Sequence, residues 1–293
     1  MGWKPVRRSP ATLAGALLVA SALVVTLGAV EWGEKPGSLL TRLRVATDPT
    51  AIDRGVLPPS SPDARHLLGT DPLGRDFLSR LLHGARVSVV VGIVAEAIAL
   101  LLGVTVGAIA GYAGGKLDAL LMRATDILLA FPIPLIAMGA MAVLDSPSLV
   151  LVFVVLGLMG WGGIARLIRA EFLSLRERDF TEAARALGAG GGRVAFLHLL
   201  PNALAPALVA ATVGVAGNIL TEAWLSFLGL GAPPPTPSWG GMIFEGRVYL
   251  TTQPWLCLLP GLALAATVAG FLLLADGLRD LLDPRRRGQT WAI

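Results

Sequence analysis

Residues 87–112 read VSVVVGIVAEAIALLLGVTVGAIAGY and contain one charged side chain, Glu96. A run of about 20 mostly apolar residues is long enough to cross the hydrocarbon core of a bilayer as a helix. In the bilayer core, a helix satisfies its own backbone hydrogen bonds, whereas an irregular chain cannot. The stretch therefore predicts a membrane-spanning helix.

The composition of the whole chain supports a membrane protein. Of 293 residues, 54% are hydrophobic and 15% are charged, against about 25% charged in a typical soluble domain. The mean hydropathy is +0.70, which excludes a soluble globular domain and a disordered chain. Cys257 is the single cysteine, so a disulfide scaffold is excluded.

Five further apolar stretches extend the pattern to an all-α polytopic protein with six transmembrane helices. The expected spans are about residues 11–30, 87–112, 117–144, 148–168, 203–220 and 256–275. The first stretch could be a signal peptide, because basic residues precede it. Its apolar run is longer than the usual signal core of about 7–15 residues, which favours a retained membrane anchor.

Basic residues predict the orientation of the spans, because cytoplasmic loops carry an excess of Lys and Arg. The N-terminus carries Lys4, Arg7 and Arg8, and residues 284–293 form a basic tail, so we expect both termini in the cytoplasm. The arginine-rich segment 166–200 is cytoplasmic by the same rule. Residues 31–86 fit less well, because their expected external position holds eight basic residues beside seven acids.

These spans divide the chain into four parts. They are the N-terminus with the first span (1–30), an external loop with an amphipathic helix (31–86), a core of five spans (87–283) and the basic tail (284–293). The amphipathic helix is expected over 71–86, with Asp71 as its cap and Pro72 in its first turn. Segment 221–255 is rich in Gly and Pro and is expected to fold back as a re-entrant or capping element.

The cytoplasmic loop 169–200 contains a short predicted helix. Asp179 and Glu182 have the spacing of a capping box, and Gly188 is placed as a C-terminal cap. Its expected apolar face consists of Phe180, Ala183, Ala184 and Leu187. A helix this short is marginal alone in water. It therefore needs a docking surface, in this subunit or in a partner.

The charged residues within or near the expected spans include four candidates for a role in the membrane: Glu96, Arg123, Asp126 and Glu222. Arg123 and Asp126 are three residues apart and can pair on one helix face. Intramembrane charges are costly and either have a structural partner or line a polar path. For these four residues the sequence leaves both roles open.

Motifs for catalysis are absent from the sequence. No GxxxxGK[ST] phosphate-binding loop occurs, since Gly114-Gly115-Lys116-Leu117 lacks the required spacing and the final Ser or Thr. No HExxH or paired-cysteine metal motif occurs, and no expected span contains a histidine. We therefore expect a chain without catalytic residues, metal or cofactor. The net charge of +4 is explained by basic cytoplasmic loops, and no nucleic-acid partner is expected.

One string in the cytoplasmic loop resembles the EAA loop of ABC importer permeases, whose pattern is EAA-x3-G-x9-I-x-L-P. It runs from Glu182-Ala183-Ala184 through Gly188 to His198-Leu199-Leu200-Pro201, with His198 at the Ile position. Its place between the fourth and fifth of six spans agrees with that family.

Further strings resemble the dipeptide/oligopeptide branch, specifically its second, C-type permease subunit. They are Leu68-Gly69-Thr70-Asp71-Pro72-Leu73-Gly74-Arg75-Asp76, Leu200-Pro201-Asn202 and Leu225-Ser226-Phe227-Leu228-Gly229-Leu230-Gly231. Arg123, Asp126 and Pro132 also sit as that branch has them. The resemblance covers about residues 5–288.

The resemblance implies a type I ABC importer permease fold in a bacterial or archaeal cytoplasmic membrane. The implied partners are membrane lipid, a second permease in a heterodimer, two ABC ATPases that carry ATP and Mg, and an extracytoplasmic substrate-binding protein. The coupling residues to the ATPases would be Phe180, Glu182, Ala183, Ala184, Arg185, Leu187 and Gly188. The implied solutes are di- and oligopeptides, with nickel or another small solute as the alternative. A stand-alone secondary transporter is the rival class, but no inverted repeat supports it.

Overall fold

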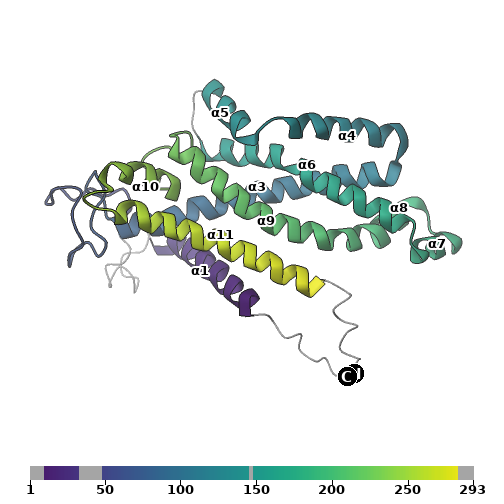
Figure 1. Cartoon of the computed structure of the whole chain (residues 1–293), viewed down its shortest axis with the longest axis horizontal. Helices are drawn as coiled ribbons and strands as arrows, with labels where there is room; N and C mark the ends of the chain where they lie inside the picture. The colour runs from purple at the N-terminus through teal and green to yellow at the C-terminus, as the bar shows by residue number, and fades with distance from the viewer. Residues whose placement is uncertain (1–9, 33–47, 145–147, 283–293) are drawn as a thin grey trace.

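A computed structural model of the chain describes residues 10–32, 48–144 and 148–282 (Figure 1). These residues form helices and no strand, which confirms the all-α class; only two isolated β-bridges occur among them. The long elements are α1 (Pro10–Trp32), α3 (Phe77–Ala113), α4 (Gly115–Ala130), α5 (Ile133–Leu144), α6 (Leu149–Arg176), α9 (Leu200–Phe227) and α11 (Trp255–Leu282). The short elements are α7 (Asp179–Ala186), α8 (Gly191–Arg193), the π-helix η1 (Val194–Leu199), α10 (Trp239–Gly246) and the 3-10 helix η2 (Arg247–Tyr249). The predicted tail 284–293 lies outside the described residues.

Four of the predicted spans are helices long and apolar enough to cross a membrane: α3, α6, the continuous stretch Gly191–Phe227 and α11. The predicted third span is instead divided into α4 and α5, which are bent by 81°. Pro132 stands at this break, where its missing N–H and fixed φ prevent a continuous helix. The apolar part of α1 is shorter, over Thr12–Val24. These four helices, the bent pair α4 and α5, and α1 are together compatible with six crossings of the membrane.

The amphipathic helix expected over 71–86 is not a separate element. Helix α3 begins at Phe77 and runs without a break into the span, and its N-cap is Asp76, which accepts a hydrogen bond from Ser79 N. The predicted cap at Asp71 is wrong. Its Oδ1 accepts from the N–H groups of Leu73 and Arg75 and closes a turn before the helix.

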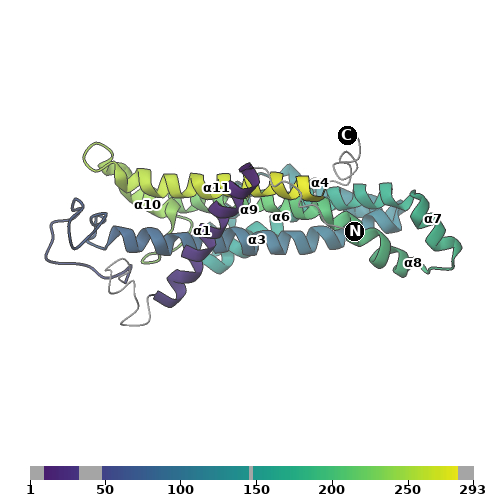
Figure 2. The same ribbon diagram turned by 90° about the horizontal axis from the view of Figure 1, so that it is seen from below.

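The long helices pack closely around α3. A Cβ at Gly107 of α3 would lie 2.4 Å from the carbonyl oxygen of Ala165 in α6, so glycine permits the two backbones to meet. Helix α9 packs on α3 and α11, and α1 lies obliquely across the long helices (Figure 2). Figure 1 shows α7 and α8 at one end of the bundle, here the α7 end, and α10 with residues 48–76 at the other, the α10 end.

Candidate functional site

Helix α7 follows α6 after a two-residue turn and is attached to it by one buried side chain. Thr181 is fully buried, and its hydroxyl donates to the carbonyl of Leu175 at 2.8 Å. The predicted capping box is wrong, because the N-cap is Arg178 and no side chain caps the helix. Asp179 and Glu182 both lie inside the first turn, where their negative charges favour the helix dipole.

The C-terminus of α7 confirms Gly188 as the predicted C-terminal cap. This residue has a φ of +86°, a left-handed conformation that residues with a Cβ rarely adopt. Its N–H donates to the carbonyl of Arg185, and Ala189 N donates to the carbonyl of Ala184. The two bonds form a Schellman motif. A Cβ at Gly188 would touch nothing, so the demand for glycine is conformational.

The predicted apolar face of α7 is open to its surroundings. Leu187 is 90% exposed and Phe180 is 42% exposed. Ala183 is exposed and Ala184 is half-buried. The polar neighbours Glu182 and Arg185 are exposed as well. Within the described part of the chain, this helix therefore presents most of the residues predicted for coupling outward instead of packing them against its own bundle.

Two apolar residues that the sequence analysis did not select lie in the next helical element. Phe196 and Leu197 of η1 are 69% and 61% exposed. Both fall inside the EAA-x3-G-x9-I-x-L-P string, at positions where that pattern specifies no residue. The folded structure, and not the string, shows that they are exposed. They lie in the π-helical stretch η1, which is in contact with α7. π-Helical turns occur frequently at functional sites.

Among the intramembrane charges, Asp126 has a partner different from the one that its spacing suggested. Asp126 does not pair with its neighbour Arg123. It pairs with Arg166 of α6 at 2.6 Å, and both side chains are 52% exposed. Asp118 forms a second ion pair with Arg169, so two ion pairs connect α4 to α6. The sequence spacing favoured pairing of Asp126 with Arg123, because Arg166 lies 40 residues further along the chain.

The two acids on the α3–α9 interface are bound by uncharged side chains. Glu96 is 7% exposed and accepts a hydrogen bond from Asn218 Nδ2 at 2.9 Å. A Cβ at Gly214 would lie 2.3 Å from the Glu96 carboxylate, so glycine makes room for it. Glu222 is fully buried and accepts from Ser88 Oγ at 2.9 Å. Both acids thus join α3 to α9.

Buried charges also organise the α10 end. Asp71 pairs with Arg75 at 2.6 Å and with Arg80 at 3.1 Å, and all three side chains are at most 5% exposed. Glu245 of α10 closes the cluster, with Arg80 at 2.9 Å and Arg75 at 3.3 Å. The string that begins at Leu68 therefore holds α10 against the start of α3.

His66 joins the loop before α3 to two acids. Its Nδ1 lies 2.8 Å from Asp76 and its Nε2 lies 3.2 Å from Asp53. Partial burial alone lowers the pKa of His66, but the hydrogen bonds to Asp76 and Asp53 outweigh it, and the pKa is raised. Among the described residues, no group of three or more His, Cys, Asp or Glu is arranged to hold a metal ion.

Comparisons with known proteins place this architecture in a family. Residues 103–288 match the binding-protein-dependent transport system inner membrane component. The chain is 39% identical over 286 residues to the dipeptide transport system permease protein of Alkalihalophilus pseudofirmus, across 97% of this chain and 89% of that protein. It is 43% identical over 222 residues to the di/tripeptide permease of Pseudomonas aeruginosa, across 76% and 73% of the two chains.

The oligopeptide transport system permease protein of Bacillus subtilis is 41% identical over 226 residues, across 77% of this chain and 74% of that protein. Each of these relatives is named a transport system permease protein. On the family match and these identities, the chain belongs to the family of binding-protein-dependent transport system inner membrane components, the permease subunits of ABC importers.

Proposed function

We propose that this chain forms, with a second permease subunit, the membrane pathway of an ATP-driven importer of di- and oligopeptides. The names of its relatives support the peptide solute. One observation carries the proposed coupling: the string resembling the EAA loop forms a helix whose apolar face is exposed at the α7 end. In this role the chain binds no nucleotide, and ATP with Mg belongs to two partner ATPases.

The coupling surface consists of the α7 residues Phe180, Glu182, Ala183, Ala184, Arg185, Leu187 and Gly188. The small side chains of Ala183 and Ala184 allow close approach of a partner backbone, and Phe180 and Leu187 are apolar anchors on either side. Glu182 and Arg185 supply polar contacts at its edge. Gly188 fixes the direction in which the chain leaves the helix.

The proposed orientation puts the α7 end in the cytoplasm of a bacterial or archaeal cell and the α10 end outside. The arginines of 166–200 support it, because basic loops are cytoplasmic. Helix α11 runs toward the α7 end and α1 runs away from it (Figure 1), which supports cytoplasmic termini. A binding protein then delivers the solute to the α10 end, where the described residues 48–76 and 228–255 lie. The four-part division of the chain is proposed on the same basis.

The exposed charges of α4 and α6 are the proposed polar part of the pathway or of the permease interface. Asp126 and Arg166 are half-exposed, and Arg123 is exposed, on helices assigned to the membrane. Charges that face hydrocarbon are costly, so this surface requires water or a protein partner. Glu96 of α3 and Glu222 of α9 lie between these two helices and are the structural members of the set.

Co-expression with the neighbouring transporter genes tests the proposal. We expect the two ATPases and a second permease to co-purify with this chain, and labelled di- and oligopeptides to enter proteoliposomes only with ATP and the binding protein. Nickel uptake without peptide uptake would show that the solute is nickel and would leave the assignment as an ATP-driven importer unchanged. Transport by the purified chain alone would overturn the proposal in favour of a secondary transporter.

A further inference from the structure

At the α10 end, one carboxylate lies beside serine hydroxyls from α3, from α9 and from the residue before α10. Glu222 of α9 is fully buried. It accepts hydrogen bonds from Ser88 Oγ of α3 at 2.9 Å and from Ser226 Oγ of α9 at 2.6 Å. Ser238, the residue before α10, is a further and weaker hydrogen-bonding neighbour of the same carboxylate. The carboxylate therefore joins α3, α9 and the start of α10 at one point.

The same serines fix both ends of the segment between α9 and α10, residues 231–238, here named the roof segment. Ser226 Oγ also accepts from Ala232 N at 3.3 Å, and a Cβ at Gly231 would lie 1.8 Å from that oxygen. Ser238 Oγ accepts from Gly241 N at 3.1 Å and caps α10. Each end of the roof segment is thus attached to the Glu222 carboxylate through one serine.

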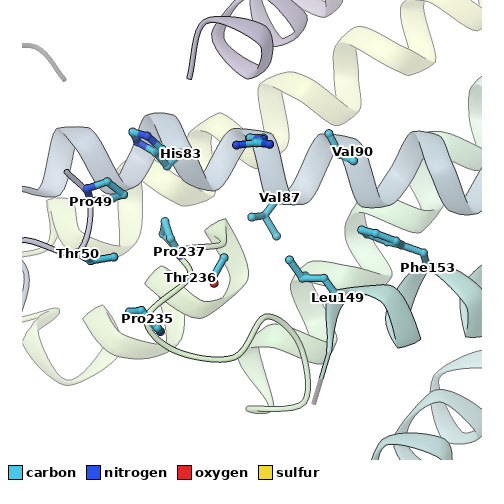
Figure 3. A pocket seen from close by; sticks show the side chains of 11 residues that line it. Pro49, Thr50, His83, Val87, Val90, Leu149, Phe153, Pro235, Thr236 and Pro237 are labelled. Atoms are coloured by element: carbon cyan, nitrogen blue, oxygen red, sulfur yellow. The ribbon is translucent and has the colours of Figure 1, made fainter. Parts of the chain in front are cut away.

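The roof segment forms one wall of a pocket of about 400 Å³ at the α10 end (Figure 3). The pocket is lined by Pro235 and Pro237 of the roof segment, Val87 and Val90 of α3, and Leu149 and Phe153 of α6. Val87 is adjacent to Ser88, the α3 partner of Glu222. One carboxylate therefore holds two opposing walls of this pocket, α3 through Ser88 and the roof segment through Ser226 and Ser238.

We propose that Glu222 is a positioning residue that sets the distance between the roof segment and α3, and so the opening of this pocket on the solute-entry side. This proposal rests on the proposed function only where it assigns the α10 end as the side from which solute enters. The partners of Glu222 are hydroxyl groups, which can donate or accept. A glutamine at this position can therefore preserve the junction, whereas an apolar residue leaves three buried hydroxyls without it.

Accessibility of the roof segment tests the proposal directly. Thr236→Cys in a Cys257→Ser background gives one thiol on the roof segment, and the purified full chain is labelled with a maleimide in detergent. We expect Glu222→Gln to label at nearly the parent rate and Glu222→Leu to label about fivefold faster. A Glu222→Leu chain that inserts normally and labels at the parent rate overturns the proposal.

A smaller change keeps the test decisive if Glu222→Leu does not fold. Ser88→Ala removes only the α3 hydroxyl, and we expect labelling of Thr236→Cys to accelerate about twofold to fivefold. Thr105→Ala is the matched control, because Thr105 donates only within α3, to Leu101. Equal labelling of the Ser88→Ala and Thr105→Ala chains overturns the proposal.

Uptake kinetics separate positioning from a general loss of structure. We expect Ser88→Ala to raise the half-saturation constant for binding-protein-delivered peptide while the amount of co-purified ATPase and the maximal rate stay unchanged. A fall in maximal rate with an unchanged half-saturation constant would contradict positioning. The labelling rates need no solute, so they decide the role of Glu222 even if the peptide assignment fails.

Discussion

The two ends of this molecule differ in how far contacts within the chain cover their side chains. At the α10 end, several polar side chains have partners within the chain: Trp239 Nε1 donates to Leu81 O and Gln253 Nε2 donates to Pro59 O, although the buried Gln253 Oε1 and Trp255 Nε1 have none among the described residues. At the α7 end, one buried hydroxyl, Thr181, attaches a helix whose apolar face is exposed. The α10 end is thus held together by contacts within this chain, whereas the α7 end leaves an apolar face exposed that a partner could cover.

The largest effect is expected from changes on the partner-facing surface of α7. Gly188→Val introduces a branched side chain at a φ of +86°, and Ala184→Phe adds bulk to the face that a partner approaches. We expect both to abolish uptake and ATPase co-purification and to leave the thermal unfolding temperature of the bundle unchanged.

The chain offers matched controls for these two variants. Gly192→Val adds the same side chain in α8, where a Cβ meets no other atom and φ is not left-handed. Ala186→Phe adds the same bulk to an exposed position two residues from Ala184, on the other side of α7. Both controls should transport normally. Equal losses in the variants and the controls would contradict a specific coupling surface.

At the α10 end, we expect a substitution in the buried charge cluster to cause a large loss of stability while ATPase binding is retained. Asp71→Ala removes the buried one of the two carboxylates that Arg75 and Arg80 share, and leaves them the partly exposed Glu245. Removing one member of a buried ion pair costs about 3–5 kcal/mol. Denaturant unfolding in detergent measures this, and ATPase co-purification from intact membranes should persist. Asp63→Ala is the control, because Asp63 is exposed and accepts only from Arg65 N and His66 N. A loss of ATPase binding with unchanged stability would reverse the contrast between the ends.

A smaller, local effect is expected where α7 joins α6. Thr181→Val removes the hydrogen bond to Leu175 O, worth about 1 kcal/mol. We expect amide hydrogen exchange in 179–187 to accelerate about fivefold, with α3 and α6 unchanged. Thr212→Val, which removes a bond within α9 to Leu208, should leave 179–187 unchanged. Exchange that rises throughout the bundle would show that α7 is an integral part of the core.

The smallest effect is a pH dependence at the α10 end. The pKa of His66 is raised above its ordinary value of 6.5 by Asp76 and Asp53, against the effect of burial. The protonated ring therefore stabilises the fold fully below pH 6.5, and this stabilisation is lost as pH rises through the folded-state pKa. Partly exposed ion pairs contribute about 0.2–1 kcal/mol. The thermal stability of the parent relative to His66→Asn should decline between pH 6 and pH 9; a constant difference would contradict the charged contact.

Local chemistry allowed the sequence to predict much of the architecture. Apolar runs located the spans because the bilayer requires about 20 apolar residues in each. Gly188 was identified as a cap because a left-handed residue after a helix favours glycine wherever the helix lies. The caps of α3 and α7 were misplaced, because several polar residues near each helix start fit a capping pattern and only the backbone selects among them.

Side-chain partners between distant helices were decided only by the tertiary structure. Asp126 had Arg123 three residues away, yet it pairs with Arg166, because α6 lies against α4 in the folded bundle. Glu222 and Ser88 are 134 residues apart, and no periodicity in either helix indicates that they meet. A membrane helix determines its own length and apolar character locally, but which of its faces meets which neighbour depends on how all the helices pack together.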